Sequence, residues 1–181
     1  MPKLIKDGAV VDDGWTLVRE AAASADVPAG VPVIVPLALW KAELDTLSAR
    51  GDVGVWLAPD AEPADLAADV AVLPLIAIDF PAFTDGRGYS SARLLRERYG
   101  FKGELRAIGD VLRDQLYAMA ECGFDAFAVR ADRDPHDALK SLGDFSGLYA
   151  PTTRTPQPWF RRREHANYGG ATPADAWLPE L

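Results

Sequence analysis

The stretch DFPAFTDGRGYSSARLLRERYGFKGELRAIGDVLR, Asp79–Arg113, decides the fold. It begins at the end of an apolar run, Leu73–Phe80, passes through a loop with two glycines and continues into a helical pattern. A second short strand pattern, Glu104–Ile108, follows and leads into another helix start. Alternation of strand and helix is typical of parallel sheets with crossover helices. Ligands of such proteins bind where strands end and helices begin, so this stretch also predicts where the protein acts.

The same alternation continues on both sides of this stretch. Strand patterns lie at 31–37, 53–58, 73–80, 104–108 and 124–129, and helical patterns at 40–49, 63–72, 90–99, 111–122 and 135–142. Ser90, Asp110 and Asp134 are predicted N-caps, and Gly100 and Gly123 are predicted helix stops. The pattern predicts an α/β domain with a mostly parallel five-stranded sheet and flanking helices. An open, doubly wound, Rossmann-like sheet is favoured. A partial (β/α) barrel is the alternative, since a complete barrel typically needs about 250 residues.

The two ends of the chain differ from this core. Residues 1–18 predict a β-hairpin around the Asp7-Gly8 turn, which belongs to a single α/β domain at 1–148. Residues 149–181 are rich in proline and threonine and lack the periodicity of packed elements. They are either a mobile tail or an arm that docks Trp159, Phe160 and Trp177 onto a partner or a second subunit.

Composition excludes several classes of protein. The chain has 181 residues and a net charge of −8, which disfavours nonspecific binding to nucleic acid or to anionic membranes. No apolar run approaches the length of a membrane span, and the start of the chain does not resemble a secretory signal. The single cysteine, Cys122, cannot form an internal disulfide, which fits a reducing compartment. We therefore expect a cytoplasmic protein with no nucleic-acid or membrane partner.

The loop Thr84–Gly88 contains the components of an anion site. Its glycines let the backbone approach a ligand, Arg87 supplies a guanidinium group, and a helix start at Ser90 supplies free N–H groups. The alternative is that the two glycines only permit a tight turn with positive φ, while Arg87 pairs with Asp85. The residues alone leave both interpretations open.

Two further junctions add charged residues. Arg106 lies within a strand pattern, so it must either pair with a carboxylate such as Asp79 or face a ligand. If the last three strands are neighbours, all three junctions meet at one edge and suit a sulfur oxyanion, a phosphate or a carboxylate. The anion-binding candidates are Thr84, Gly86, Arg87, Gly88, Ser90, Arg106, Arg113 and Arg130. The acid–base candidates are Asp85 and Asp110, although capping a helix also explains Asp110.

Metal and cofactor motifs are not present in the sequence. His136 and His165 are far apart and lack ligand spacing, and one cysteine cannot ligate an iron–sulfur cluster. The glycine loop matches neither a Walker motif nor a dinucleotide fingerprint. The residues therefore predict no metal site and no identifiable cofactor.

Four segments resemble the bacterial domain-of-unknown-function family 934: Phe83–Ser90, Ala92–Arg96, Gly103–Leu116 and Cys122–Phe127. The resemblance extends over most of residues 1–145. Proteins of this family are labelled as oxidoreductases involved in sulfite reduction and accompany assimilatory sulfite reductase. The resemblance thus implies a place in sulfate assimilation and cysteine biosynthesis, with the sulfite reductase hemoprotein as partner.

These observations lead to three functional hypotheses. They do not decide whether the chain is an enzyme. The first is an accessory protein of sulfite reduction that acts through the anion-binding edge of the sheet. The second is a small α/β enzyme that uses the same edge on a small anionic substrate. The third is a structural homo-oligomer joined through the C-terminal tail.

Overall fold

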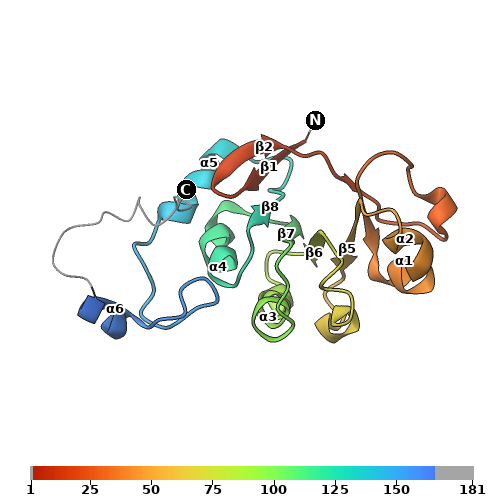
Figure 1. Cartoon of the computed structure of the whole chain (residues 1–181). Coiled ribbons are helices and arrows are strands. Elements are labelled where there is room, and N and C mark those ends of the chain that lie inside the picture. Colours follow the sequence, from red (N-terminus) through yellow and green to blue (C-terminus); the bar gives the residue numbers. More distant parts are fainter. Residues whose placement is uncertain (1, 166–181) are drawn as a thin grey trace.

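The computed structural model describes residues 2–165 and contains one eight-stranded sheet in the order β2-β1-β8-β7-β6-β5-β4-β3 (Figure 1). The strands are β1 Lys3–Lys6, β2 Ala9–Asp12, β3 Thr16–Leu17, β4 Val33–Pro36, β5 Val53–Leu57, β6 Leu75–Phe80, β7 Glu104–Gly109 and β8 Ala126–Phe127. The α-helices are α1 Leu37–Ala42, α2 Leu44–Ser48, α3 Arg87–Arg93, α4 Leu116–Glu121, α5 Pro135–Lys140 and α6 Trp159–His165. Short helical turns are η1 Ser24–Asp26, η2 Pro63–Leu66, η4 Arg113–Gln115 and η5 Ser141–Gly143, and the π-helical turn η3 Leu94–Arg98 continues α3.

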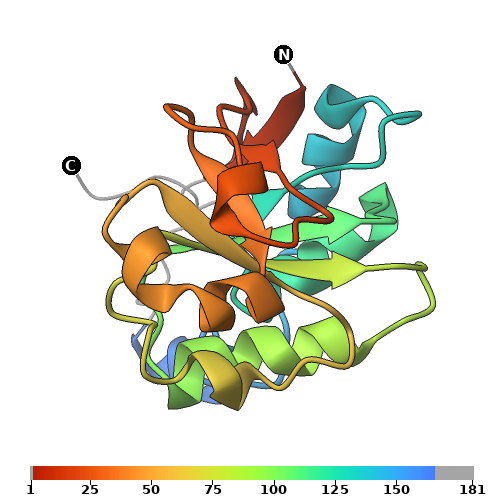
Figure 2. The same ribbon diagram turned by 90° about the vertical axis from the view of Figure 1, so that its right-hand side faces the viewer.

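Strands β3 to β8 are parallel and lie beside one another in chain order. A doubly wound sheet needs a reversal of strand order, and this sheet has none, so the favoured prediction was wrong in its topology. The alternative of a partial (β/α) barrel fits. Figures 1 and 2 show α1 to α4 on one side of the sheet, which curls away from them into a half-barrel.

The sheet has more strands than the five expected. β3 adds a sixth parallel strand beside β4, and the predicted hairpin joins the sheet because β1 pairs antiparallel with β8. Asp7 and Gly8 both have positive φ, as the hairpin turn requires. The α/β class and the mostly parallel arrangement are confirmed.

Two apolar layers follow from the alternation of side chains along each strand. The layer facing the helices contains Val33, Val35, Val55, Ile76, Ile78, Leu105 and Ala107. The layer on the concave face contains Ile34, Leu75, Ala77 and Ile108, with Trp15, Leu17 and Trp56 packed against it. Trp15 lies on the link between β2 and β3, which crosses the open side of the half-barrel in Figure 1.

Several predicted helix ends are found. Gly100 and Gly123 have positive φ at the ends of η3 and α4, and Asp134 caps α5 by accepting a hydrogen bond from the N–H of His136. The helix bounds differ from the predicted ones: the first helical segment already begins at Leu37, and 63–72 forms only η2 followed by turns. No helix in the described range is both long and apolar enough to cross a bilayer.

The first part of the C-terminal segment contacts the domain. The Thr152 hydroxyl donates to Glu121 of α4 at 2.5 Å, and the Thr153 hydroxyl donates to Glu97 of η3 at 2.6 Å. Trp159 and Phe160 belong to α6, whereas Trp177 lies outside the described residues.

Candidate functional site

Three loops meet at the edge where the parallel strands end, and Asp110 links them. Its Oδ2 accepts a hydrogen bond from the N–H of Phe83 in the β6–α3 loop, at 3.0 Å. Its Oδ1 accepts from Arg130 in the β8–α5 loop, at 2.9 Å. The convergence of the three junctions is thus found. The predicted capping role of Asp110 was wrong, because η4 begins after Leu112, whose N–H donates to the Gln115 side chain instead.

The exposed arginines at this edge are already paired with carboxylates. Both oxygens of Asp85 accept from Arg87, at 3.0 and 2.6 Å. Arg130 donates to Asp132, at 2.6 and 2.9 Å, as well as to Asp110. The hydrogen bonds from the Arg87 guanidinium hold the pKa of Asp85 below its usual range. The hydrogen bonds from Arg130 lower the pKa of Asp132 in the same way. Asp85 therefore stays ionised at neutral pH, which suits an ion-pair partner better than a general acid.

The two loop glycines do not adopt positive φ, so that part of the alternative interpretation was wrong. Gly86 precedes α3 with φ −88° and has open space around it. Gly88 is buried, and a Cβ there would lie 2.6 Å from the ring of Phe80 and 3.0 Å from Ile78. Gly88 therefore lets α3 pack closely on β6, and its backbone is not available to a ligand.

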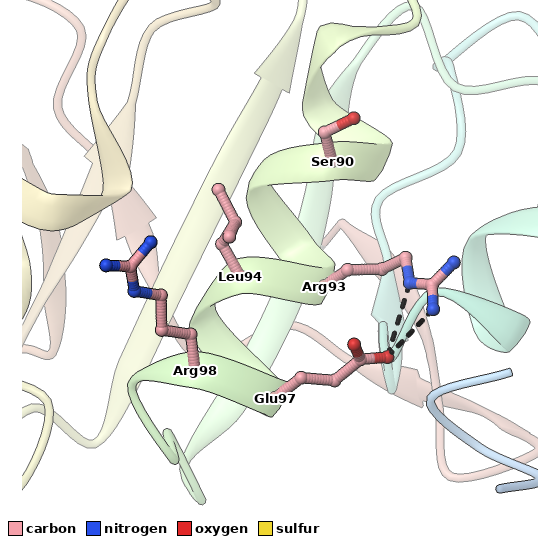
Figure 3. A pocket seen from close by; sticks show the side chains of 5 residues that line it. All are labelled: Ser90, Arg93, Leu94, Glu97 and Arg98. Atoms are coloured by element: carbon pink, nitrogen blue, oxygen red, sulfur yellow. Dashed lines mark hydrogen bonds and ion pairs between the residues drawn. The ribbon is translucent and has the colours of Figure 1, made fainter.

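Helix α3 begins at Arg87, three residues before the predicted start. Ser90 is consequently inside the helix, and its assignment as N-cap was wrong because the chain turns into the helix directly after Gly86. The exposed members of the anion-binding candidates in this loop are Thr84, Gly86 and Arg87. Ser90 instead lines a shallow pocket of about 440 Å³ along the outer side of the helix, with Leu94 and Arg98 (Figure 3).

Arg106 lies away from this edge. Only 2% of its surface is exposed, and it pairs with Glu104 at 2.7 Å and with Asp13 at 2.9 Å on the concave face. Lys6 pairs with Glu104 in turn, at 2.8 Å. Because Asp13 belongs to the β2–β3 link, this buried cluster holds the link against the concave face of the sheet. Arg106 is therefore separate from the other candidates, and it lines a pocket of about 230 Å³ with Asp13 and Glu104.

The predicted partner of Arg106, Asp79, pairs with Arg19 instead, at 2.8 Å. The strand register explains the difference: Arg106 lies opposite Ala77, so Asp79 is two positions nearer the edge. The Arg19 guanidinium also lies over the ring of Trp56, at 5.3 Å from its centroid. Asp79 Oδ1 is buried within ion-pair distance of Arg19 but has no hydrogen-bond donor aligned with it among the described residues.

Sequence reasoning missed Arg19 and Trp56. Their only signals were a cation directly after the strand pattern at 15–18 and a tryptophan in an otherwise aliphatic strand. Asp79, Arg19 and Trp56 lie on the concave side near the ends of β6, β3 and β5, where barrel enzymes place their reacting groups.

Arg113 also lies apart from the residues that Asp110 links. It pairs with Asp137 at 3.1 Å and lines a pocket of about 230 Å³ with Arg133 and Asp134. Cys122 is half-buried, and burial raises the pKa of its thiol, as expected for a cysteine at the edge of the core. Within residues 2–165, no group of three or more histidine, cysteine, aspartate or glutamate side chains is placed to hold a metal ion.

Comparison with protein families gives one match. A family model described as "Bacterial protein of unknown function (DUF934)" matches residues 54–160, which is more than half of the chain. No curated protein matches. The match starts later than the expected resemblance, since it leaves out residues 1–53 with β1 to β4, α1 and α2, and it continues into α6. It covers β6, β7, β8 and all three loops that meet at Asp110. The chain belongs to this family of bacterial proteins, DUF934.

Proposed function

We propose that this protein is an accessory protein of assimilatory sulfite reduction and acts with sulfite reductase through the edge of the sheet around Asp110. Membership in the family supports the proposal, because the resemblance implies the company of sulfite reductase. The observation that carries it is that the family match includes every loop at this edge. The acidic chain, with its net charge of −8, also suits contact with another protein better than contact with nucleic acid.

The ligand at this edge is a small anion such as a sulfur oxyanion, held by Arg87. The Arg87 side chain is mostly exposed, and ion pairs of exposed side chains contribute little to stability. An oxyanion can therefore replace Asp85 as the partner of Arg87 at little cost. The exposed hydroxyl of Thr84 and backbone of Gly86 lie in the same loop and add hydrogen-bond donors.

Calorimetry with sulfite and with sulfate tests the anion site. Wild-type protein is compared with Arg87→Ala and with the control Arg93→Ala, which removes another exposed arginine and its pair with Glu97 from the same helix. We expect Arg87→Ala to abolish the binding heat and Arg93→Ala to retain it. Equal binding of the anion by both variants would contradict the proposed role of Arg87 as the anion site.

The accessory role is tested separately. The tagged chain is purified from cells grown on sulfate, and a deletion strain is grown with sulfate or cysteine as the sulfur source. We expect recovery of the sulfite reductase hemoprotein, together with growth on sulfate that is impaired and restored by cysteine. Failure to recover the hemoprotein, together with normal growth on sulfate, would overturn the role.

A second candidate function is an enzyme acting on a small anionic substrate. The observation that favours it is the Asp79–Arg19 pair at the mouth of the half-barrel, where barrel enzymes place their reacting groups and where Arg19 supplies a cation for an anionic substrate. The acceptor positions of Asp85 and Asp110 are taken by arginines and backbone N–H groups. If the purified chain alone turns over sulfite or sulfate, Asp79→Asn should abolish turnover and Asp85→Asn should not.

A further inference from the structure

The segment that follows α5 in the chain carries an exposed apolar surface. Its members are Phe145, Leu148, Tyr149, Trp159 and Phe160, called here the aromatic surface. Three of them, Phe145, Tyr149 and Phe160, expose more than half of their surface. A large exposed apolar patch is unusual on a monomer and marks an interaction site.

Backbone contacts bring the two halves of the aromatic surface together. The N–H of Trp159 donates to the carbonyl of Tyr149 at 3.1 Å, and the Trp159 ring lies against Gly147. Arg162 donates to the carbonyl of Leu148 at 2.6 Å and stacks over the Trp159 ring at 5.1 Å. In Figure 1 this stretch lies beyond α4, at the opposite end of the molecule from α1 and α2.

The segment between the two halves is anchored to the domain. Thr152 and Thr153 donate to Glu121 and Glu97, and the bond from Thr153 lowers the pKa of Glu97. Arg154 lies 3.8 Å from Glu121. A surface that is already held in place loses less conformational freedom on binding, which favours affinity.

Charge indicates the chemistry of the partner. Residues 145–162 contain three arginines and no carboxylate, within a chain of net charge −8; Arg154 lies against Glu121, which leaves Arg161 and Arg162 beside the aromatic surface. Arg161 is exposed beside Phe160, and Arg162 lies on Trp159. Aromatic residues and arginine dominate the energetics of protein interfaces. A second copy would bring the same arginines against each other, so a different, acidic protein surface is the better match.

We propose that the aromatic surface docks a partner protein whose own surface offers an apolar pocket rimmed by carboxylates. The proposal adds a second contact with the partner, besides the edge around Asp110, and therefore rests on the proposed accessory role. The probe is the purified sulfite reductase hemoprotein, and the measurement is its dissociation constant for the full chain by biolayer interferometry.

The test variant is Tyr149→Ala/Phe160→Ala, since both side chains are exposed and their loss leaves the core intact. The matched control is Val72→Ala, another large exposed apolar residue elsewhere on the chain. We expect the double variant to weaken binding by about tenfold or more, as truncation at a hot spot does, and the control to match wild type. Arg161→Glu, which leaves the apolar groups in place, should also weaken binding and reduce its dependence on salt.

The outcomes separate this inference from the accessory role. No binding by the wild-type chain would overturn the role. Equal binding by wild type, the double variant and Arg161→Glu would leave the role standing and overturn the docking surface. A wild-type dimer that becomes a monomer in the double variant, with hemoprotein binding unchanged, would make a second copy the occupant and overturn the proposal. If removal of residues 166–181 strengthens hemoprotein binding, those residues are the occupant of the aromatic surface, and the proposal is overturned as well.

Discussion

Arg106 shows what residue chemistry predicts and what it leaves undecided. A charge inside a strand must find a partner, and the sequence therefore predicted either a carboxylate or a ligand. One carboxylate is Glu104, two residues earlier on the same strand, and the other is Asp13, 93 positions away along the chain, because the β2–β3 link crosses the concave face. No local pattern encodes that crossing. The Arg87–Asp85 pair was predictable, since its members are two residues apart and share one loop.

Gly109 gives a prediction at the same scale. It has φ +95°, and a Cβ there would collide with the carbonyl oxygen of Phe80 and lie 2.8 Å from Asp79 Oδ1. Gly51 has φ +71° with open space around it. We expect Gly109→Ala to lower the free energy of unfolding by about 3 kcal/mol, from backbone strain plus overpacking, and Gly51→Ala by about 1 kcal/mol, from strain alone.

Urea denaturation followed by circular dichroism measures both variants. Equal losses at the two positions would mean that the β7 end relaxes around the new methyl group. In that case the close packing of Gly109 against Asp79 would not be a constraint on the site.

At the scale of elements, α3 and η3 form one continuous helical segment from Arg87 to Arg98 that ends as the sequence predicts and starts earlier. The end was predictable because Gly100 provides the left-handed residue that a helix stop needs. The start was not, because Ser90 is a good N-cap in sequence, whereas the structure uses Gly86 without a side-chain cap. Close packing of Gly88 on Phe80 places the first turn and overrides the capping preference.

Arg96 in this segment connects two other parts of the chain, the link before β7 and the link between α4 and β8. It donates to the carbonyls of Phe101 and Gly103 before β7 and of Gly123 after α4, each at 2.8 or 2.9 Å. It also pairs with Asp125 at 2.5 Å. We expect Arg96→Ala to lower the free energy of unfolding by about 2–4 kcal/mol, because it leaves these acceptors without a donor.

The control for Arg96 is Arg93→Ala, one turn away on the exposed face, where the pair with Glu97 contributes at most about 0.5 kcal/mol. Denaturant midpoints of the two variants give the comparison. A small effect at Arg96 would show that water replaces its hydrogen bonds, and that the family motif containing Arg96 serves something other than stability.

At the scale of the whole molecule, the periodicity predicted which segments are strands but could not predict their order. Each strand–helix unit fits either a sequential or a reversing sheet, because every crossover joins parallel strands in both. What determines the order here is contact between distant segments. The hairpin occupies the edge beside β8, and the β2–β3 link closes the concave face through Asp13 and Trp15. The same contacts decide that Arg19, and not Arg106, reaches Asp79.

Hydrogen exchange distinguishes the two orders. In a doubly wound sheet the second or the third strand of the series lies at an edge, whereas here β5 and β6 are both interior. We therefore expect the amides of Val53–Leu57 and Leu75–Phe80 to exchange only with global unfolding, and those of β2 and β3, at the true edges, to exchange first. Rapid exchange along β5, with protection retained in β6 and β7, would contradict the sequential order. That result would also contradict the proposed site at the mouth of the half-barrel, because Trp56 would then not lie beside Asp79 and Arg19.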